Sequence, residues 1–245
     1  MAKVITIATH KGGQTKTTTV KNLALSASEK GNTLMVDLDP QHNLSTWVGA
    51  NLDKTIDDFF EGTPIENTIT NIRPNLDIIG SSLKLEKISQ NMIARNHREY
   101  IFKRGLSSVQ DKYDYIFVDT SPSLGVLVQN AIMATDFLLI PLSQEAGGTE
   151  GLLDFVHLAE ELIGEKPKFG LVATKVDKRK TVASKAIKAD LAAFSLSEYL
   201  LNTSIPVDAH VDHANTAGMF LDEYDKNSEA LHSYRELFDE VIKLI

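Results

Sequence analysis

The chain has 245 residues, of which 42% are apolar, enough to bury a full core as one large domain. Its 25 basic and 33 acidic residues give a net charge of −8, which argues against a globally basic nucleic-acid-binding protein. Cysteine is absent, which excludes disulfides, thiolate metal sites and cysteine-held iron–sulfur clusters. No apolar run reaches membrane-spanning length and Met1-Ala2-Lys3 opens no secretory signal, so we expect a cytoplasmic protein.

Short apolar segments recur along the chain, and most of them are followed by a helical pattern. Nearly continuous apolar runs are typical of strands that are buried on both faces of a parallel sheet. Strands that alternate with helices predict a doubly wound α/β fold, a mostly parallel sheet flanked by helices, in one domain over residues 1–245. Ligands of such sheets bind at the carboxyl ends of the strands. The predicted strands are Val4–Ala8, Thr33–Leu38, Leu76–Ile79, Tyr115–Val118, Phe137–Leu142 and Phe169–Ala173.

A glycine-rich segment, Thr9–Thr19, follows the first predicted strand and precedes a helix predicted over Val20–Glu29. This order points backbone N–H groups and a helix N-terminus at an anion. It predicts a phosphate-binding loop in which Lys16 reaches the β- and γ-phosphates and the Thr17 hydroxyl binds Mg²⁺. The alternative is an ordinary glycine turn with solvated lysines.

The phosphate-loop pattern is imperfect because Thr15 stands where glycine usually precedes the Lys-Thr pair. Glycine permits left-handed dihedrals that a β-branched residue avoids. If the loop requires such dihedrals at this position, we expect Thr15→Gly to tighten nucleotide binding about tenfold.

Two carboxylates, Asp37 and Asp39, end the second predicted strand and precede Pro40. If the first two strands are neighbours, these side chains stand near the phosphates. There they would hold Mg²⁺-bound water and orient an attacking water, because phosphoryl transfer depends mainly on positioning and electrostatics. The alternative is an Asp-Pro turn that caps the next short helix.

A third carboxylate, Asp119, ends the wholly apolar strand predicted at Tyr115–Val118. This is the Walker B arrangement, in which the carboxylate bonds a Mg²⁺-bound water or the Thr17 hydroxyl. Asp119 as a simple helix cap is the alternative.

The remaining predicted helices cover Ile56–Phe60, Leu83–Ala94, His97–Gln110, a segment ending near Thr135, a segment ending at Ile163, and Ser228–Ile245. The turn at 174–177 could hold a nucleobase, and a plain turn is at least as good an interpretation. The stretch 208–213 contains two His and two Asp, but its spacing matches no structural metal site, so we predict a polar loop and helix start.

Basic residues concentrate in 166–188, which holds eight of them and one acidic residue. This pattern indicates either a surface that binds nucleic-acid phosphates or the solvated face of a helix. The candidate DNA-binding residues are Lys178, Arg179, Lys180, Lys185 and Lys188.

Three ordered motifs resemble those of the ParA-type plasmid and chromosome partition ATPases, which belong to the deviant Walker A group of P-loop NTPases. The motifs are 11–18 (KGGQTKTT), 36–41 (VDLDPQ) and 113–125 (YDYIFVDTSPSLG). The resemblance implies an ATP-dependent DNA-partition switch. An ATP-bound sandwich homodimer would bind DNA non-specifically, and a centromere-binding adaptor protein would stimulate hydrolysis of ATP to ADP, moving plasmid or chromosome cargo. Such a protein is expected in the cytoplasm, associated with the nucleoid.

The resemblance also implies residue roles. Lys11 resembles the signature lysine that reaches the other subunit's nucleotide, Lys16 the phosphate-loop lysine, and Asp39 the residue that positions or activates water. These three are the expected catalytic residues. The expected ATP-binding residues are Lys11, Gly12, Gly13, Gln14, Thr15, Lys16, Thr17, Thr18, Thr174 and Pro206, and the expected Mg²⁺ residues are Thr17, Asp37, Asp39 and Asp119.

One alternative function is a MinD-like cell-division regulator that acts on membranes. It would need a basic amphipathic C-terminal tail, whereas the segment 228–245 carries acidic residues on its polar face and is expected to pack on the sheet. An electron-transfer reductase on the same scaffold is excluded by the absence of cysteine. A nucleotide-binding protein without hydrolysis is supported only by Thr15.

Overall fold

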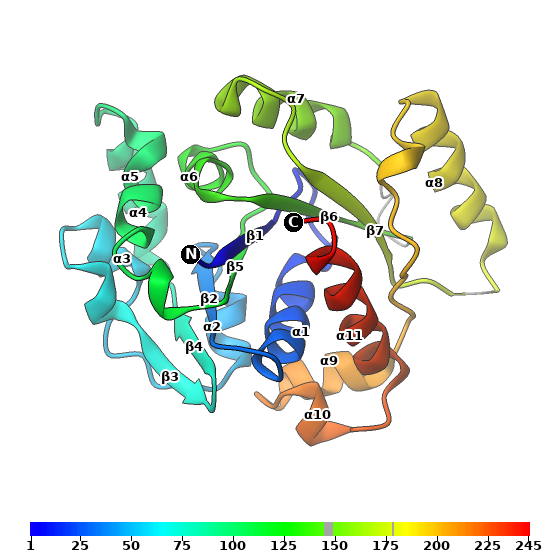
Figure 1. Cartoon of the computed structure of the whole chain (residues 1–245), viewed down its shortest axis with the longest axis horizontal. Coiled ribbons are helices and arrows are strands. Elements are labelled where there is room, and N and C mark those ends of the chain that lie inside the picture. Colours follow the sequence, from blue (N-terminus) through cyan, green and yellow to red (C-terminus); the bar gives the residue numbers. More distant parts are fainter. Residues whose placement is uncertain (145–148, 178) are drawn as a thin grey trace.

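The computed structural model describes residues 1–144, 149–177 and 179–245. Its centre is a seven-stranded sheet of order β3-β4-β2-β5-β1-β6-β7, parallel except for β3, which pairs with β4 in the antiparallel sense. The predicted α/β fold is therefore confirmed (Figure 1). The strands are β1 Lys3–Ile7, β2 Thr33–Leu38, β3 Thr70–Arg73, β4 Leu76–Ile79, β5 Tyr115–Thr120, β6 Phe137–Ser143 and β7 Phe169–Thr174.

Helices cover both faces of this sheet (Figure 1). The α-helices are α1 Lys16–Ser28, α2 Asn43–Trp47, α3 Ile56–Phe60, α4 Lys84–Met92, α5 Ile101–Leu106, α6 Val126–Ala134, α7 Leu152–Ile163, α8 Thr181–Ala193, α9 Ala209–Thr216, α10 Leu221–Tyr224 and α11 Glu229–Ile242. Short 3₁₀ helices lie at η1 Ile65–Thr68, η2 Arg98–Tyr100, η3 Gln110–Lys112 and η4 Ser197–Tyr199.

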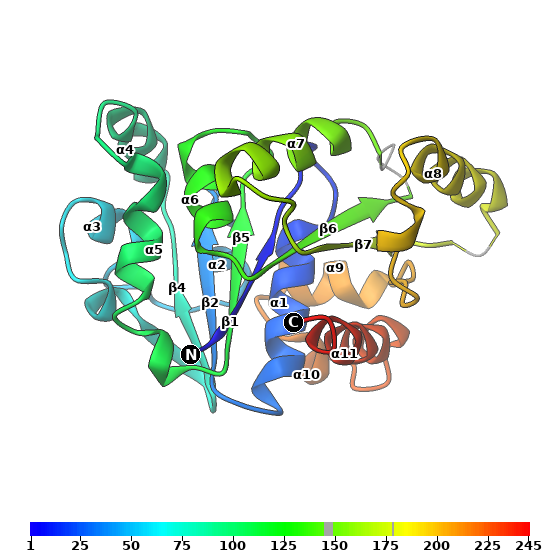
Figure 2. The same ribbon diagram turned by 45° about the horizontal axis from the view of Figure 1, so that its top comes forward.

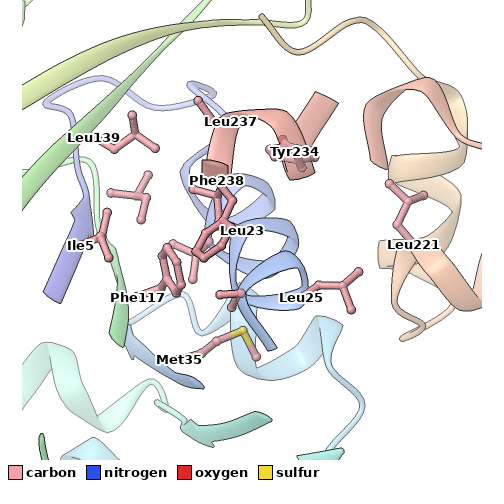
Figure 3. Close-up of a cluster of buried hydrophobic side chains, with 14 of the residues drawn as sticks. Ile5, Leu23, Leu25, Met35, Phe117, Leu139, Leu221, Tyr234, Leu237 and Phe238 are labelled. Atoms are coloured by element: carbon pink, nitrogen blue, oxygen red, sulfur yellow. The ribbon is translucent and has the colours of Figure 1, made fainter. Parts of the chain in front are cut away.

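Alternate residues of each strand enter different cores, because successive side chains of a strand point to opposite faces. On one face, Phe117 joins a buried cluster with side chains of α1 and α11, among them Leu23 and Phe238 (Figure 3). On the other face, Ile116 packs in a cluster with residues of α3 to α6. The amphipathic helix α11 therefore packs in one core with α1 and the sheet, as its pattern predicted.

Two features of the sheet differ from the sequence prediction. β1 and β2 are not neighbours, since β5 lies between them and pairs with both. β3 was not predicted because its sequence, TNIR, is polar and it forms a partly exposed edge.

The continuous helix predicted over 97–110 is wrong, because the segment is split into η2, α5 and η3. In a continuous helix, the Phe102 N–H would bond the Arg98 carbonyl. Instead, the buried Asn130 of α6 stands between these groups: the Phe102 N–H donates to its Oδ1 (2.9 Å), and its Nδ2 donates to the Arg98 carbonyl (2.8 Å). Tertiary contact thus overrides the local helical pattern.

Candidate nucleotide-binding site

The loop between β1 and α1 has the backbone of an anion-binding turn. Gly13 and Thr15 both have positive φ, 74° and 62°, and α1 begins directly afterwards at Lys16. The Thr15 side chain does not cap α1, so the N–H groups of the first helical turn stay available to an anion. The left-handed dihedrals considered for position 15 are therefore present, at a residue that is not glycine.

The two residues that depart from the usual glycine pattern are tied to neighbouring strands. The Oε1 atom of buried Gln14 accepts the N–H of Ser143 at the end of β6 (2.5 Å). The Thr15 hydroxyl donates to Thr174 Oγ1 at the end of β7 (2.9 Å) and also lies 2.6 Å from the Gln14 carbonyl oxygen. The sequence carried no signal for the contacts with Ser143 and Thr174, because each lies more than a hundred residues away from its partner.

The Lys16 side chain turns back over this loop and is buried, with Nζ 3.3 Å from the Lys11 carbonyl oxygen that accepts its hydrogen bond. Burial lowers the pKa of Lys16, whereas the nearby carboxylates of Asp119 and Asp39 oppose this shift. A buried ammonium group at the phosphate loop, with Asp119 and Asp39 nearby, is placed to bind an anion that enters the loop.

The three predicted carboxylates meet at one edge of the sheet. Asp37 and Asp119 are direct neighbours in the β2–β5 register, and Asp119 is also opposite Ile7 where β1 leads into the loop. Because β5 lies between β1 and β2, Asp119 is the acid next to the phosphate loop, and Asp37 lies one strand further away.

Asp37 is fully buried but well supported by hydrogen bonds. Its Oδ1 accepts the Asp39 N–H (3.1 Å), and its Oδ2 accepts the N–H and the hydroxyl of Ser45 (3.0 and 2.7 Å). Burial raises the pKa of Asp37 to about 6, although the bonds from Ser45 oppose the rise. The Asp39 side chain accepts the Gln41 N–H (2.9 Å), so the Asp-Pro turn and the acid cluster coexist.

Asp119 differs from Asp37 because neither of its buried carboxylate oxygens has a hydrogen-bond partner within the described chain. Burial and the Asp37 carboxylate raise its pKa well above the usual range, while the nearby Thr17 hydroxyl, whose contact with Asp119 falls short of hydrogen-bond geometry, and the Lys16 ammonium oppose the rise. A buried carboxylate without a partner is costly unless a cation or a donor completes it. Asp119 and the neighbouring Thr17 hydroxyl are oxygen donors of the kind that Mg²⁺ prefers, and Mg²⁺ is usually bound through one or two carboxylates together with phosphate oxygens and not by a full set of protein ligands.

Lys11 lies at the outer side of the loop and forms an ion pair with Glu150, just before α7. The Glu150 side chain is 76% exposed and Lys11 is 31% exposed. Gly12 and Gly13 between Lys11 and the rest of the loop are exposed. Nothing in the sequence indicated Glu150, which is 139 residues from Lys11.

A cavity of about 200 Å³ adjoins the loop and brings together four predicted nucleotide contacts: Thr15, Thr18, Thr174 and Pro206. Its wall continues into α9 through Asp208 and Val211. Strand β7 and the segment around Pro206 are joined there, since the Val176 N–H donates to the Ile205 carbonyl (2.9 Å). The cavity therefore joins Thr174 and Pro206 to the loop, and their contact with a nucleobase stays a prediction.

The stretch 208–213 serves as a helix start, as predicted. Asp208 caps α9 by accepting the His210 N–H (2.9 Å), and its other oxygen accepts the Ser228 hydroxyl (2.6 Å). Among the described residues, no group of three or more His, Cys, Asp or Glu side chains is arranged to hold a metal ion.

The residues of the predicted basic cluster have different surroundings in the structure. Lys178 lies outside the described residues, and Arg179 forms an ion pair with Asp177 (2.9 Å). Lys180 stands just before α8, whereas Lys185 and Lys188 are exposed on α8, whose Ile187 and Leu191 face the core. Within the described chain, no helix is long and apolar enough to cross a membrane.

Comparison with known proteins agrees with this geometry. The family model described as an AAA domain matches residues 2–169. The chromosome-partitioning ATPase Soj of Treponema pallidum is 30% identical over 99% of this chain and 98% of its own length. A putative plasmid partition protein from Borrelia burgdorferi bound to AMPPNP superposes with a TM-score of 0.85 at 27% identity, covering all of both chains. A cobyrinic acid a,c-diamide synthase from Mycobacterium smegmatis, with bound ADP and magnesium, gives 0.84 at 25% identity, covering 99% of this chain and 95% of its own.

The parallel sheet, the phosphate loop and the acids at the strand ends define a P-loop nucleotide-binding protein. Within that class, the chain belongs to the ParA/Soj family of partition ATPases.

Proposed function

We propose that this chain is an ATP-dependent DNA-partition switch that hydrolyses ATP to ADP and phosphate. The observation that carries the ATPase proposal is the buried, unpartnered carboxylate of Asp119 beside Lys16 and the acids of β2. This arrangement supports binding of a cation and a phosphate chain together, because each compensates the other's charge.

The site residues divide the work by position. The loop residues Lys11 to Thr18 surround the phosphates, with Lys16 supplying the positive charge, while Thr174 and Pro206 contact the base. Thr17, Asp37, Asp39 and Asp119 would hold Mg²⁺, which neutralises developing charge on the phosphate oxygens when bound. Asp39, whose Oδ1 accepts the Gln41 N–H, orients the attacking water.

The test of this site is Lys16→Ala, with Lys30→Ala as matched control on an exposed lysine just past the end of α1. We expect Lys16→Ala to abolish binding of a fluorescent ATP analogue in the presence of Mg²⁺ while circular dichroism and melting show a folded protein. The control should bind as the natural chain does. Unchanged affinity in folded Lys16→Ala would refute the site.

The DNA-binding part of the proposal rests on α8 and the segment before it. Lys185 and Lys188 stand exposed, and together with Lys178, Arg179 and Lys180 they would contact phosphates without reading sequence. We expect retention on DNA to require ATP, to ignore sequence and to weaken steeply with salt. Lys185→Glu with Lys188→Glu should lose DNA and keep ATPase activity.

The ATP-bound state is proposed to be a sandwich homodimer on the nucleoid, whose hydrolysis is stimulated by a centromere-binding adaptor protein. This extends to the chain what the names of its relatives state, chromosome partitioning and plasmid partition. The membrane-acting alternative has no supporting observation, because the apolar residues of α11, such as Leu237 and Phe238, are buried against the core.

A further inference from the structure

We infer that the face formed by α4, η2 and α5 is a second nucleic-acid-binding surface, which takes the phosphate backbone of a duplex other than the one at α8. The choice of DNA as occupant rests on the proposed function. The location rests on charge, exposure and rigidity of residues 84–104, which we call the α4–α5 surface.

The α4–α5 surface has a net positive charge, whereas the net charge of the whole chain is negative. It contains six basic and two acidic residues, a net charge of +4 in a chain that carries −8. The basic residues are Lys84, Lys87, Arg95, Arg98, Lys103 and Arg104. Local concentration of one sign against the overall charge attracts a polyanion to that face.

These cations are accessible and lack acidic partners. Five of the six are exposed and Arg98 is half-buried. None of them forms an ion pair with any described residue. By contrast, Arg179 near α8 is already paired with Asp177. In the described part of the chain, the α4–α5 surface therefore holds more uncompensated positive charge than the surface first predicted to bind DNA.

The arginines are held in place but keep most of their donors. Arg95 donates one bond to the Phe60 carbonyl (2.9 Å), and Arg98 donates one to the Ile93 carbonyl at the end of α4 (2.7 Å). A guanidinium has five N–H donors in a planar fork, so each retains donors suited to phosphate oxygens. Lys84 and Lys87 lie on the same side of α4, one turn apart.

The surface stands on a rigid support. Buried Asn130 of α6 holds η2 and α5 through Arg98 and Phe102, while Leu85 and Met92 fix α4 in the core. The surface lies at one end of the long axis of the molecule and α8 lies at the other (Figures 1 and 2). The two basic faces are therefore placed to hold two separate duplexes.

A nucleic acid fits this surface better than an anionic membrane. An interfacial membrane helix inserts its apolar face into the lipid. The apolar faces of α4 and α5 are already buried, through Ile88, Met92 and Phe102. Among the exposed apolar side chains of this region, Leu83 and Ile93 lie just outside opposite ends of α4 and Tyr100 lies in η2, so none of the three belongs to an apolar face of α4 or α5.

The test compares two triple variants of equal charge change. Lys84→Glu with Lys87→Glu and Lys103→Glu alters the α4–α5 surface at lysines that make no side-chain hydrogen bond in the described chain. Lys30→Glu with Lys54→Glu and Lys226→Glu alters exposed lysines elsewhere. Binding to a labelled duplex of arbitrary sequence is titrated at several salt concentrations with Mg²⁺ and a non-hydrolysable ATP analogue. Co-capture of a second, differently labelled duplex is measured in parallel.

We expect the α4–α5 variant to lose co-capture at least about fivefold and to reduce the steepness of log affinity against log salt by roughly 2 to 3. The control triple should change neither, and ATP-analogue binding should be equal in both. An α4–α5 variant that behaves as the control overturns the inference. The proposed function then stands if Lys185→Glu with Lys188→Glu still loses DNA, and fails if the natural chain does not bind DNA at all. Binding to phosphatidylglycerol vesicles, lost in the α4–α5 variant while DNA binding is kept, would identify a membrane surface instead.

Discussion

Thr15 shows how one residue can carry strain at a functional loop. A β-branched side chain in the left-handed region, here at φ 62° and ψ 21°, costs about 1–2 kcal/mol. The hydroxyl bond to Thr174 offsets part of this cost. If the loop keeps this conformation with and without nucleotide, the strain lowers the stability of the fold and cancels from the binding equilibrium. The tenfold tightening expected for glycine is then the competing outcome, which applies if the loop adopts these dihedrals only when nucleotide binds.

We predict that Thr15→Gly changes the free energy of unfolding by less than about 1 kcal/mol, because relief of the left-handed strain is offset by loss of the Thr15 hydroxyl bond and by the added freedom of glycine in the unfolded chain. Thr15→Gly should nevertheless be more stable than Thr15→Ala, which loses the same bond and keeps the strain. ATP-analogue affinity should change less than about threefold. Urea denaturation and a fluorescence titration measure the two quantities. Thr15→Ala is the control: it keeps the strain, loses the hydroxyl, and should destabilise by about 1 kcal/mol. Tenfold tighter binding without added stability would contradict this account.

At the scale of elements, Lys21 joins α1 to three other segments. Its Nζ donates to the Trp47 carbonyl at the end of α2 (2.8 Å), to Asn215 Oδ1 in α9 (3.1 Å) and to the Met219 carbonyl (2.8 Å). The side chain is only 1% exposed, and these three bonds use all three donors of its ammonium group. Burial lowers the pKa of Lys21 to about 8, and Glu223 opposes the shift.

This shift predicts a dependence of stability on pH. Between about pH 8 and 10.5, the unfolded chain keeps the Lys21 proton that the folded chain releases, so the stability contribution rises with pH. This stability contribution is complete above about pH 10.5 and is lost as the pH falls to about 8. The difference in unfolding free energy between the natural chain and Lys21→Met should rise by up to roughly 3 kcal/mol over this range. Urea denaturation at about pH 7.5 and 9.5 measures it, with exposed Lys30→Met as control. If the difference in unfolding free energy between the natural chain and Lys21→Met is the same at both pH values, the pKa of Lys21 is not lowered in the folded chain.

The same scale shows what the sequence can predict. The buried strands were recognisable because their apolar runs report burial on both faces, and the acids at their ends were correctly expected to share one edge. The order of the strands could not be predicted, because the pairing of β5 between β1 and β2 depends on long-range packing. For the same reason the sequence did not predict the Lys11–Glu150 ion pair or the Gln14–Ser143 bond, whose partners are distant in sequence.

At the scale of the whole molecule, the ion pair between Lys11 and Glu150 has to open if Lys11 is to reach a nucleotide in a second subunit. Exposed pairs contribute little to stability, so Glu150 restrains Lys11 only weakly. Glu150 is thus expected to affect the equilibrium of the proposed dimer modestly, whereas Lys11 is expected to determine whether that dimer forms.

Three variants separate these roles when they are sized with ATP and Mg²⁺ and assayed for phosphate release. Lys11→Ala should stay monomeric, since it removes the cation that is proposed to cross the interface. Asp39→Ala should dimerise but hydrolyse slowly, because the phosphates are still bound while the water is no longer oriented. Glu150→Gln should dimerise about two- to fivefold more tightly, because Lys11 no longer leaves a charged partner. The controls are the same variants without nucleotide, which should all be monomers.

If Lys11→Ala and Asp39→Ala behave identically, the two residues do not have separate roles. If Glu150→Gln weakens the dimer, Glu150 supports the interface and does not restrain Lys11.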